Sequence, residues 1–252
     1  MHTDRRLAGK VALVSGASSG IGRAVALAMG ESGMRVGLMG RRIERLAQLS
    51  GEIEQRGGEA LCLAADVTDE EQVAFSLRAV AEQLGAVEVL VNSAGLGRDA
   101  PLLTGDTAAF REMLEVNVLA LAALTREVVR RMREAEVAGH VVHISSMSAY
   151  RVQRPLGMYA ATKHAVRALT EGLRRELREQ QTKIRVTAIS PADTDTEFMA
   201  RFYGSEQEAR RRHPPYRALS PEDVAGAVMY ALGTPPHVEI HDILMRPVEQ
   251  PD

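Results

Sequence analysis

Tyr159 and Lys163 are the residues of this chain whose types and spacing most directly suggest chemistry. Residues four apart on a helix share one face, so the phenol and the ammonium are expected to lie together. At ~4 Å and an effective dielectric of ~20, an ammonium attracts a phenolate by ~4 kcal/mol. Since free tyrosine titrates near pH ~10, this attraction lowers its pKa by at most about three pH units. The pair predicts a phenol that transfers a proton near neutral pH.

Serine hydroxyls that could hold a carbonyl oxygen precede this pair. An expected strand at 140–145 leads into Ser145 and Ser146. Successive strand residues face opposite sides, so only one of these two serines is expected to point toward Tyr159. Ser148 is a third candidate. The alternative role for Ser145 is packing within the strand, with local hydrogen bonds to the backbone.

A glycine-rich segment, SGASSGIG at 15–22, joins an expected strand at 11–14 to an expected helix at 21–32. Its spacing is G-x-x-x-G-x-G. Glycines permit a tight turn and let backbone N–H groups approach a pyrophosphate, while the helix N-terminus adds partial positive charge. The alternative is a turn that binds no ligand. The candidate cofactor contacts of this segment are Gly16, Ser18, Ser19, Gly20, Ile21 and Gly22.

Two arginines, Arg41 and Arg42, follow the second expected strand at 35–39. In NAD-binding proteins, a carboxylate at this strand end binds the ribose 2′-hydroxyl, but here the position carries Gly40. A guanidinium pairs with a 2′-phosphate in fork geometry. The sequence therefore favours NADP(H) over NAD(H). The alternative is that the arginines only begin a solvated helix.

Asp66 and Val67 follow the third expected strand, at 60–65. Asp66 is placed to accept a hydrogen bond from the amino group of an adenine. The alternative is that it caps the next helix, which Thr68 and Asp69 open. Both Asp66 and Val67 are candidate contacts of a bound nucleotide.

Strands and helices that could position these groups alternate along the whole chain. The remaining strands are expected at 87–91, 184–189 and 240–245, and the remaining helices at 43–56, 106–134, 157–179 and 221–232. Such alternation implies parallel pairing with right-handed crossovers. We expect an α/β fold, a Rossmann-type doubly wound parallel sheet of about seven strands with helices on both faces. With no linker or repeat, residues 1–252 are expected to form one domain.

The segment at about 197–217 fits this alternation least well. It combines the aromatic residues Phe198, Phe202 and Tyr203 with a basic run at 210–212. Because it follows the sixth expected strand, it should lie at the carboxyl edge of the sheet, where ligands bind in such folds. One interpretation is a substrate lid. The other is a surface helical pair with a solvated basic face.

Composition excludes several other classes of protein. The 31 basic and 33 acidic residues give a net charge of −2, so no nucleic-acid or membrane partner is expected. Cys62 is the only cysteine, so no intramolecular disulfide can form. No apolar stretch approaches the ~18 to 20 residues that span a bilayer. We expect a soluble, cytoplasmic protein without a metal site.

Taken together, these motifs resemble those of a classical short-chain dehydrogenase/reductase. The matching segments are SGASSGIG at 15–22, NSAG at 92–95, EVNV at 115–118, YAATK at 159–163 and PADTDT at 191–196. They span nearly the whole chain in the family's order. The departures are Ser15 for threonine, Ser93 for asparagine and Ala192 for glycine, and none of them removes a catalytic group.

The resemblance implies hydride transfer between a nicotinamide and a carbonyl carbon, with Tyr159 as the general acid/base. It implies that Lys163 lowers the tyrosine pKa and binds the nicotinamide ribose. Ser146, thirteen positions before the tyrosine, would orient the substrate oxygen, and Asn117 would support a water relay to Lys163. Further cofactor contacts implied by the resemblance are Asn92, Ala94, Gly95, Pro191, Thr194 and Thr196.

The ending HDILMRPVEQ at 241–250 resembles a branch with clavulanate dehydrogenase, 3-hydroxy acid dehydrogenases and some 17β-hydroxysteroid-type reductases. Family members are usually tetramers, so a homotetramer or homodimer is expected, acting on a small-molecule carbonyl or alcohol. The aromatics at 198–203 favour an apolar substrate, whereas the arginines at 210–212 would suit a carboxylate. Two alternatives stay open, a catalytically silent nucleotide-binding regulator and an epimerase or dehydratase on the same fold.

Overall fold

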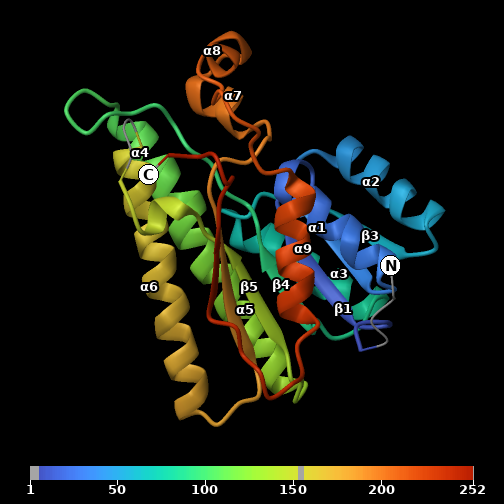
Figure 1. Cartoon of the computed structure of the whole chain (residues 1–252). Coiled ribbons are helices and arrows are strands. Elements are labelled where there is room, and N and C mark those ends of the chain that lie inside the picture. The colour runs from blue at the N-terminus through green and yellow to red at the C-terminus, as the bar shows by residue number, and fades with distance from the viewer. Residues whose placement is uncertain (1–5, 153–155, 252) are drawn as a thin grey trace.

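A parallel β-sheet forms the centre of the molecule (Figure 1). The computed structural model describes residues 6–152 and 156–251, and within them seven strands pair in the order β3-β2-β1-β4-β5-β6-β7. The strands are β1 (Val11–Ser15), β2 (Arg35–Gly40), β3 (Glu59–Ala64), β4 (Val89–Asn92), β5 (His140–Ile144), β6 (Arg185–Pro191) and β7 (Asp242–Met245). The order reverses between β1 and β4, the switch point at which doubly wound sheets bind ligands. The expected Rossmann-type fold is confirmed.

Helices cover both faces of this sheet (Figure 1). One face carries α1 (Gly20–Glu31), α2 (Ile43–Gln55) and α9 (Pro221–Leu232), and the other carries α3 (Glu70–Gln83), α5 (Leu121–Glu134) and α6 (Gly157–Glu179). Strand β1 shows why both faces are apolar. Ala12 and Val14 pack with the first group of helices, and Val11 and Leu13 with the second. Because strand side chains alternate between faces, a continuous apolar strand fills two cores.

The long helix expected at 106–134 is confirmed in extent, but it is not α-helical throughout. It consists of α4 (Thr107–Leu114), a π-helical turn (Glu115–Ala120) and α5, which follow one another without a gap. A π-helical turn carries i→i+5 bonds and appears mostly as a single turn within an α-helix, frequently at a functional site. This turn holds Asn117, which is buried and bonds outside the helix. The apolar period is helical on both sides of the turn, so the sequence pattern does not distinguish it from regular α-helix.

Two short helices, α7 (Phe198–Tyr203) and α8 (Glu206–Arg211), stand out from the body of the molecule at one end (Figure 1). Helix α7 packs inward, since Phe202 is buried and its carbonyl accepts from the amide of Asp99 at 3.0 Å. Helix α8 has no buried residue among those described. An isolated bridge between Thr194 and Leu219 closes the base of this excursion. The segment is therefore packed in its first half and solvated in its second.

The strands begin and end within two residues of the expected bounds. Over the described residues, no helix is long and apolar enough to cross a bilayer. Across the same residues, no group of three or more His, Cys, Asp or Glu side chains is arranged to hold a metal ion.

Candidate active site

The glycine-rich turn between β1 and α1 packs directly against the end of β4. Gly16 has φ +70°, and a Cβ on it would lie 2.7 Å from the amide nitrogen of Ala94. A Cβ on Gly22 would collide with the carbonyl oxygen of Gly16. The Ser15 hydroxyl accepts from the amides of Ser93 and Ala94 at 3.2 and 3.3 Å. The glycines therefore allow close backbone approach at the switch point of the sheet.

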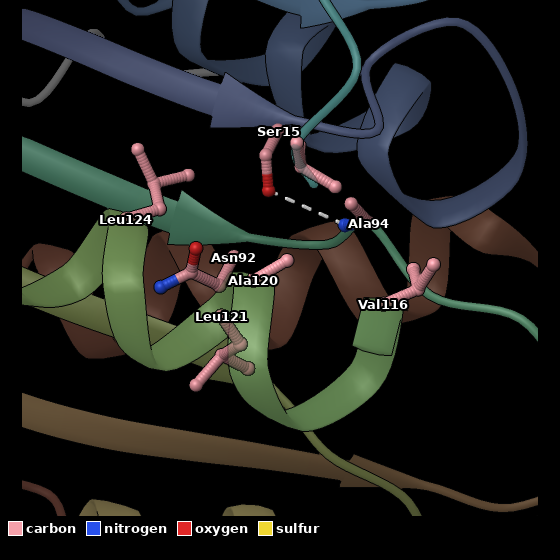
Figure 2. Close-up of a pocket in the computed structure, with 8 residues that line it drawn as sticks. Ser15, Asn92, Ala94, Val116, Ala120, Leu121 and Leu124 are labelled. Atoms are coloured by element: carbon pink, nitrogen blue, oxygen red, sulfur yellow. Dashed lines mark hydrogen bonds between the residues drawn. The ribbon is translucent and has the colours of Figure 1, made fainter. Parts of the chain in front are cut away.

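A small pocket lies beside this turn (Figure 2). Ser15, Asn92 and Ala94 line it from the ends of β1 and β4, and the π-helical turn and α5 close its other side. The helical lining residues are Val116, Ala120, Leu121 and Leu124, and Val67 completes the wall. The structure thus brings together three of the residues expected to contact a nucleotide, Val67, Asn92 and Ala94.

Asn117 ties the π-helical turn to the chain after β4. Its Oδ1 accepts from the amide of Leu96 at 2.8 Å, and its Nδ2 donates to the Leu96 carbonyl at 2.7 Å. Nδ2 also donates to the Thr162 hydroxyl on α6 at 3.1 Å. A Cβ on Gly95 would lie 3.3 Å from Asn117 Oδ1 and 3.8 Å from Lys163 Nζ. Gly95, Asn117 and Lys163 are therefore neighbours.

Lys163 and Tyr159 lie together on α6, but they do not form a direct ion pair. Lys163 Nζ is buried and donates to the Ile144 carbonyl at the end of β5, at 3.0 Å. It lies 5.7 Å from the centroid of the Tyr159 ring. The Phe198 ring of α7 also contacts Tyr159, with its centroid 5.2 Å from that of the tyrosine ring. The phenol is held between the end of β5 and the first turn of α7.

Of the candidate serines, Ser146 is the one that reaches Tyr159. The Ser146 side chain lies close enough to the Tyr159 phenol to act on its pKa. Ser146 Oγ also accepts from the amide of Ser148 at 3.0 Å, which caps a 3₁₀ turn (Met147–Ala149). The Ser145 hydroxyl is buried and makes no hydrogen bond within the described structure. Ser148 contributes its backbone to this arrangement, so the hydroxyl beside the phenol belongs to Ser146.

Burial dominates the electrostatics of the pair. It raises the pKa of Tyr159 to about 12, although the Ser146 side chain acts in the opposite direction. It lowers the pKa of Lys163 to about 8. Burial and the Ser146 side chain account for this shift, so the expected lowering of the tyrosine pKa by Lys163 stays a prediction. The ammonium is directed at the Ile144 carbonyl, and burial penalises the charged form of each group.

Arg42 joins the glycine-rich turn to the segment after β6. Its Nε and Nη2 donate to the Ser18 hydroxyl at 3.2 and 2.8 Å, and Nη2 also donates to the Ser19 hydroxyl at 2.8 Å. Its Nη1 lies 3.3 Å from Glu197 Oε2. Arg42 is thus held at the edge of the turn, whereas Arg41 is largely exposed and its Nη1 lies 3.5 Å from Asp66 Oδ2.

Asp66 does not cap the helix that follows it. Its Oδ1 accepts from the amide and hydroxyl of Thr68 at 3.0 and 2.8 Å. Helix α3 is capped by Asp69, which accepts from the amides of Glu71 and Gln72. Asp66 therefore stays at the end of β3, where its expected role toward an adenine is still a prediction.

The loop after β6 returns over the glycine-rich turn. A Cβ on Gly20 would lie 3.2 Å from Thr196 Cγ2, and Thr196 Oγ1 accepts from the amide of Phe198 at 3.2 Å. Pro191 ends β6, and the Thr194 hydroxyl donates to the Ala192 carbonyl at 3.0 Å. The expected cofactor contacts of the glycine-rich turn and those of the loop after β6 therefore meet at one edge of the sheet.

Sequence reasoning missed a buried hydrogen-bond chain behind the site. Asn92 Nδ2 donates to Thr125 Oγ1 at 2.8 Å, which lies 3.2 Å from His143 Nε2. His143 Nδ1 lies 2.8 Å from Thr170 Oγ1, and that hydroxyl donates to the Val166 carbonyl. The directions are mutually consistent if Nδ1 of the neutral imidazole carries the proton. The two histidines of β5, His140 and His143, were the only available signal.

The family model for short chain dehydrogenases matches residues 10–207. The chain belongs to the short-chain dehydrogenase/reductase family. It is similar to dehydrogenase/reductase SDR family member 11 of Bos taurus, with 44% identity over 247 residues that cover 96% of this chain and 97% of that protein. Farnesol dehydrogenase of Aedes aegypti is 38% identical over 247 residues, covering 96% of this chain and 98% of that protein.

Solved structures of this short-chain dehydrogenase/reductase family agree with the fold described above. The closed form of serine dehydrogenase complexed with NADP⁺ has a TM-score of 0.88 and 31% sequence identity, covering 96% of each chain. Among similar family structures, some are complexed with NADP and others with NADH. The chain is therefore an oxidoreductase of this family, and its cofactor preference has to be argued from its own residues.

Proposed function

We propose that this protein interconverts a carbonyl and an alcohol with NADP(H), using Tyr159 as the proton-transfer group. The observation that carries the proposal is the convergence of Ser146, Tyr159 and Lys163 beside the switch point of the sheet. Asn117 and Gly95 lie against the same lysine. These side chains come from β5, α6, the π-helical turn and the end of β4, so only the complete fold assembles them.

The residues at the sheet edge suit a nicotinamide dinucleotide. Gly16 and Gly22 allow the turn to pack closely against Ala94 and against itself, at the N-terminal end of α1. Lys163 is a candidate to bind the nicotinamide ribose, and Gly95 is a candidate contact near the adenosine ribose. Thr196 lies over Gly20 of the turn. A bound nicotinamide would supply the hydride. The remaining contribution of the protein is to orient the carbonyl and to move the proton.

Tyr159 suits the role of acid in carbonyl reduction. Its pKa of about 12 keeps the phenol protonated at neutral pH. Ser146 is placed to hold the substrate oxygen while the Tyr159 hydroxyl donates its proton to that oxygen. An ammonium at Lys163 favours the phenolate left behind. We propose that Asn117, fixed by its bonds to Leu96, supports the water that restores the proton.

Preference for NADP(H) over NAD(H) rests on the arginines after β2. Arg42 is held by the Ser18 and Ser19 hydroxyls at the mouth of the glycine-rich turn, and Arg41 follows β2 directly. Gly40 provides no carboxylate that would repel a 2′-phosphate. A guanidinium fixed in this position provides paired N–H donors for that group.

We also propose that residues 197–217 form a substrate lid. The contact between Phe198 and Tyr159 supports this interpretation for α7, because a surface helical pair would not touch the phenol. The aromatic lining favours a small apolar carbonyl or alcohol as the substrate.

A homotetramer or homodimer is proposed on the basis of exposed apolar residues at β7 and α9. Leu244 lies on edge strand β7 and is 52% exposed, and Tyr230 on α9 is 65% exposed. Light scattering coupled to size-exclusion chromatography measures the assembly directly, and a monomer at micromolar concentration would refute this part of the proposal.

The test compares the wild type with Tyr159→Phe, which removes one hydroxyl at the site. We expect NADPH to bind more tightly than NADH, and carbonyl reduction in the variant to fall by at least about 10³-fold with NADPH binding retained. Tyr230→Phe is the matched control, since this tyrosine is exposed on α9 and should keep full activity. Binding without turnover of any carbonyl would favour a silent nucleotide-binding regulator.

A further inference from the structure

Glu197, the residue before α7, lies among three arginines. Its Oε1 is 2.5 Å from Arg45 Nη1, and its Oε2 is 3.3 Å from Arg42 Nη1 and 2.5 Å from Arg201 Nη2. Arg42 and Arg45 belong to the start of α2, whereas Arg201 belongs to α7. One carboxylate therefore joins the lid segment to the arginines that follow β2.

The guanidinium of Arg42 is shared between this carboxylate and the glycine-rich turn. Nη1 faces Glu197, while Nε and Nη2 donate to the Ser18 and Ser19 hydroxyls. Although burial opposes it, hydrogen bonds from Arg45 and Arg42 lower the pKa of Glu197. The carboxylate is therefore ionised at neutral pH. It occupies donors of the same guanidinium to which the proposed function assigns the cofactor's 2′-phosphate.

The chemistry of the two anions is alike at this point. A carboxylate and a phosphate monoester both accept paired N–H bonds from a guanidinium, and the phosphate carries more charge and more acceptor oxygens. Glu197 is about half exposed, so solvent screens its ion pairs and each contributes little free energy. A stronger anion can therefore displace it without a large penalty. Arg45, released by that displacement, becomes a second donor.

We propose that Glu197 is a cofactor-specificity residue that competes with the 2′-phosphate of NADP(H) for Arg42 and Arg45. This inference rests on the proposed function. It assigns to the lid a carboxylate that weakens binding of the phosphorylated cofactor and leaves NAD(H) unaffected. The next residue, Phe198, contacts Tyr159, so displacement of Glu197 would act on the segment that covers the phenol.

The test is a set of equilibrium dissociation constants for NADPH and NADH at fixed ionic strength. Glu197→Gln keeps the shape of the side chain and removes its charge. Because exposed ion pairs are worth ~0.2 to 1 kcal/mol each, we expect NADPH to bind roughly three- to tenfold more tightly and NADH to change less than about twofold. In an Arg42→Gln background, the effect of Glu197→Gln should shrink to about twofold or less.

Glu208→Gln is the matched control for loss of one negative charge from the same segment. Glu208 is similarly exposed and pairs with Arg211 and Arg212 of the α8 region rather than with Arg42. The inference is overturned if Glu197→Gln and Glu208→Gln have the same effect, or if Glu197→Gln weakens NADPH. A loss of NADH affinity would also overturn it, because Glu197 would then serve as the ribose-binding carboxylate.

The Arg42→Gln variant separates this inference from the proposed function. If the wild type prefers NADPH and Arg42→Gln removes that preference, the cofactor assignment stands whatever Glu197→Gln does. If the wild type does not prefer NADPH, the cofactor assignment fails and the competition fails with it. Circular dichroism of each variant checks that the fold is retained, which is expected because each of these side chains is at least partly exposed.

Discussion

Burial acts on Tyr159 and Lys163 in opposite directions and suits the reduction of a carbonyl. It raises the pKa of the phenol to about 12 and lowers that of the ammonium to about 8, because low-dielectric surroundings disfavour the charged form of each. A protonated phenol is the form that donates to a carbonyl oxygen. Alcohol oxidation needs the phenolate instead, so it should require a more alkaline medium than reduction does.

Lys163 gives the reduction reaction a testable alkaline limit. Its ammonium is present below a pKa of about 8 and is lost above it, so kcat/KM for carbonyl reduction should fall as the pH rises through about 8. Lys163→Arg keeps a positive charge throughout this range, and its weaker activity should show no such inflection. Initial rates between pH 6 and 10 measure both profiles. An identical inflection in the two proteins would assign it to another group.

Among the elements, the turn between β1 and α1 depends most on the absence of side chains. Gly22 lies in the first turn of α1, where a Cβ would collide with the carbonyl oxygen of Gly16. Gly172 lies within α6, and nothing lies within 4 Å of the position that its Cβ would take. The two glycines therefore offer the same substitution in opposite surroundings.

Alanine substitution at these two helical glycines should have effects of opposite sign. Gly22→Ala should destabilise the fold by roughly 1 to 3 kcal/mol and abolish NADPH binding, because the turn must open. Gly172→Ala should stabilise it by about 0.5 to 1 kcal/mol through helix propensity, with unchanged binding. Urea denaturation measures the stability of each variant, and a nucleotide titration measures its NADPH affinity. Retained NADPH affinity in Gly22→Ala would refute the role given to the turn.

The elements were largely predictable from the sequence, whereas several contacts between them were not. The strands follow from short apolar β-branched runs and the helices from a period of about 3.6, and the order of the site motifs follows from the chain. The π-helical turn at 115–120 preserves the apolar face on both sides, so no local pattern reveals it. The Arg42–Glu197 contact joins positions 155 residues apart. The pKa of Tyr159 depends on burial, which spacing alone does not specify.

At the scale of the whole molecule, two buried histidines join layers of the fold. His143 on β5 connects to α5 and α6 through Thr125 and Thr170, and His140 on the same strand lies 2.8 Å from the Thr187 hydroxyl on β6. Burial lowers the pKa of each to about 3. Their imidazoles are therefore neutral in the folded protein over the whole physiological range.

These histidines predict a loss of stability in mild acid. The unfolded chain binds a proton at each imidazole below pH ~6.5, whereas the folded protein does so only near pH 3. As the pH falls through ~6.5, each histidine therefore lowers the free energy of unfolding, with a slope that approaches about 1.4 kcal/mol per pH unit well below this value. His143→Gln should remove one histidine's share of that slope, and exposed His237→Gln should leave it unchanged. Urea denaturation between pH 7 and 5 measures these slopes. Equal slopes for the wild type and His143→Gln would contradict the prediction.

The hydrogen-bond chain from Asn92 to Thr170 also makes the His143 ring a spectroscopic reporter. Its Nδ1–H is buried and bonded, so it should exchange slowly with solvent and give a resolved imidazole signal in ¹⁵N NMR spectra. The chain contains no tryptophan, so indole fluorescence offers no alternative. Because Asn92 lines the pocket at the switch point, the frequency of that one proton should respond when a dinucleotide binds.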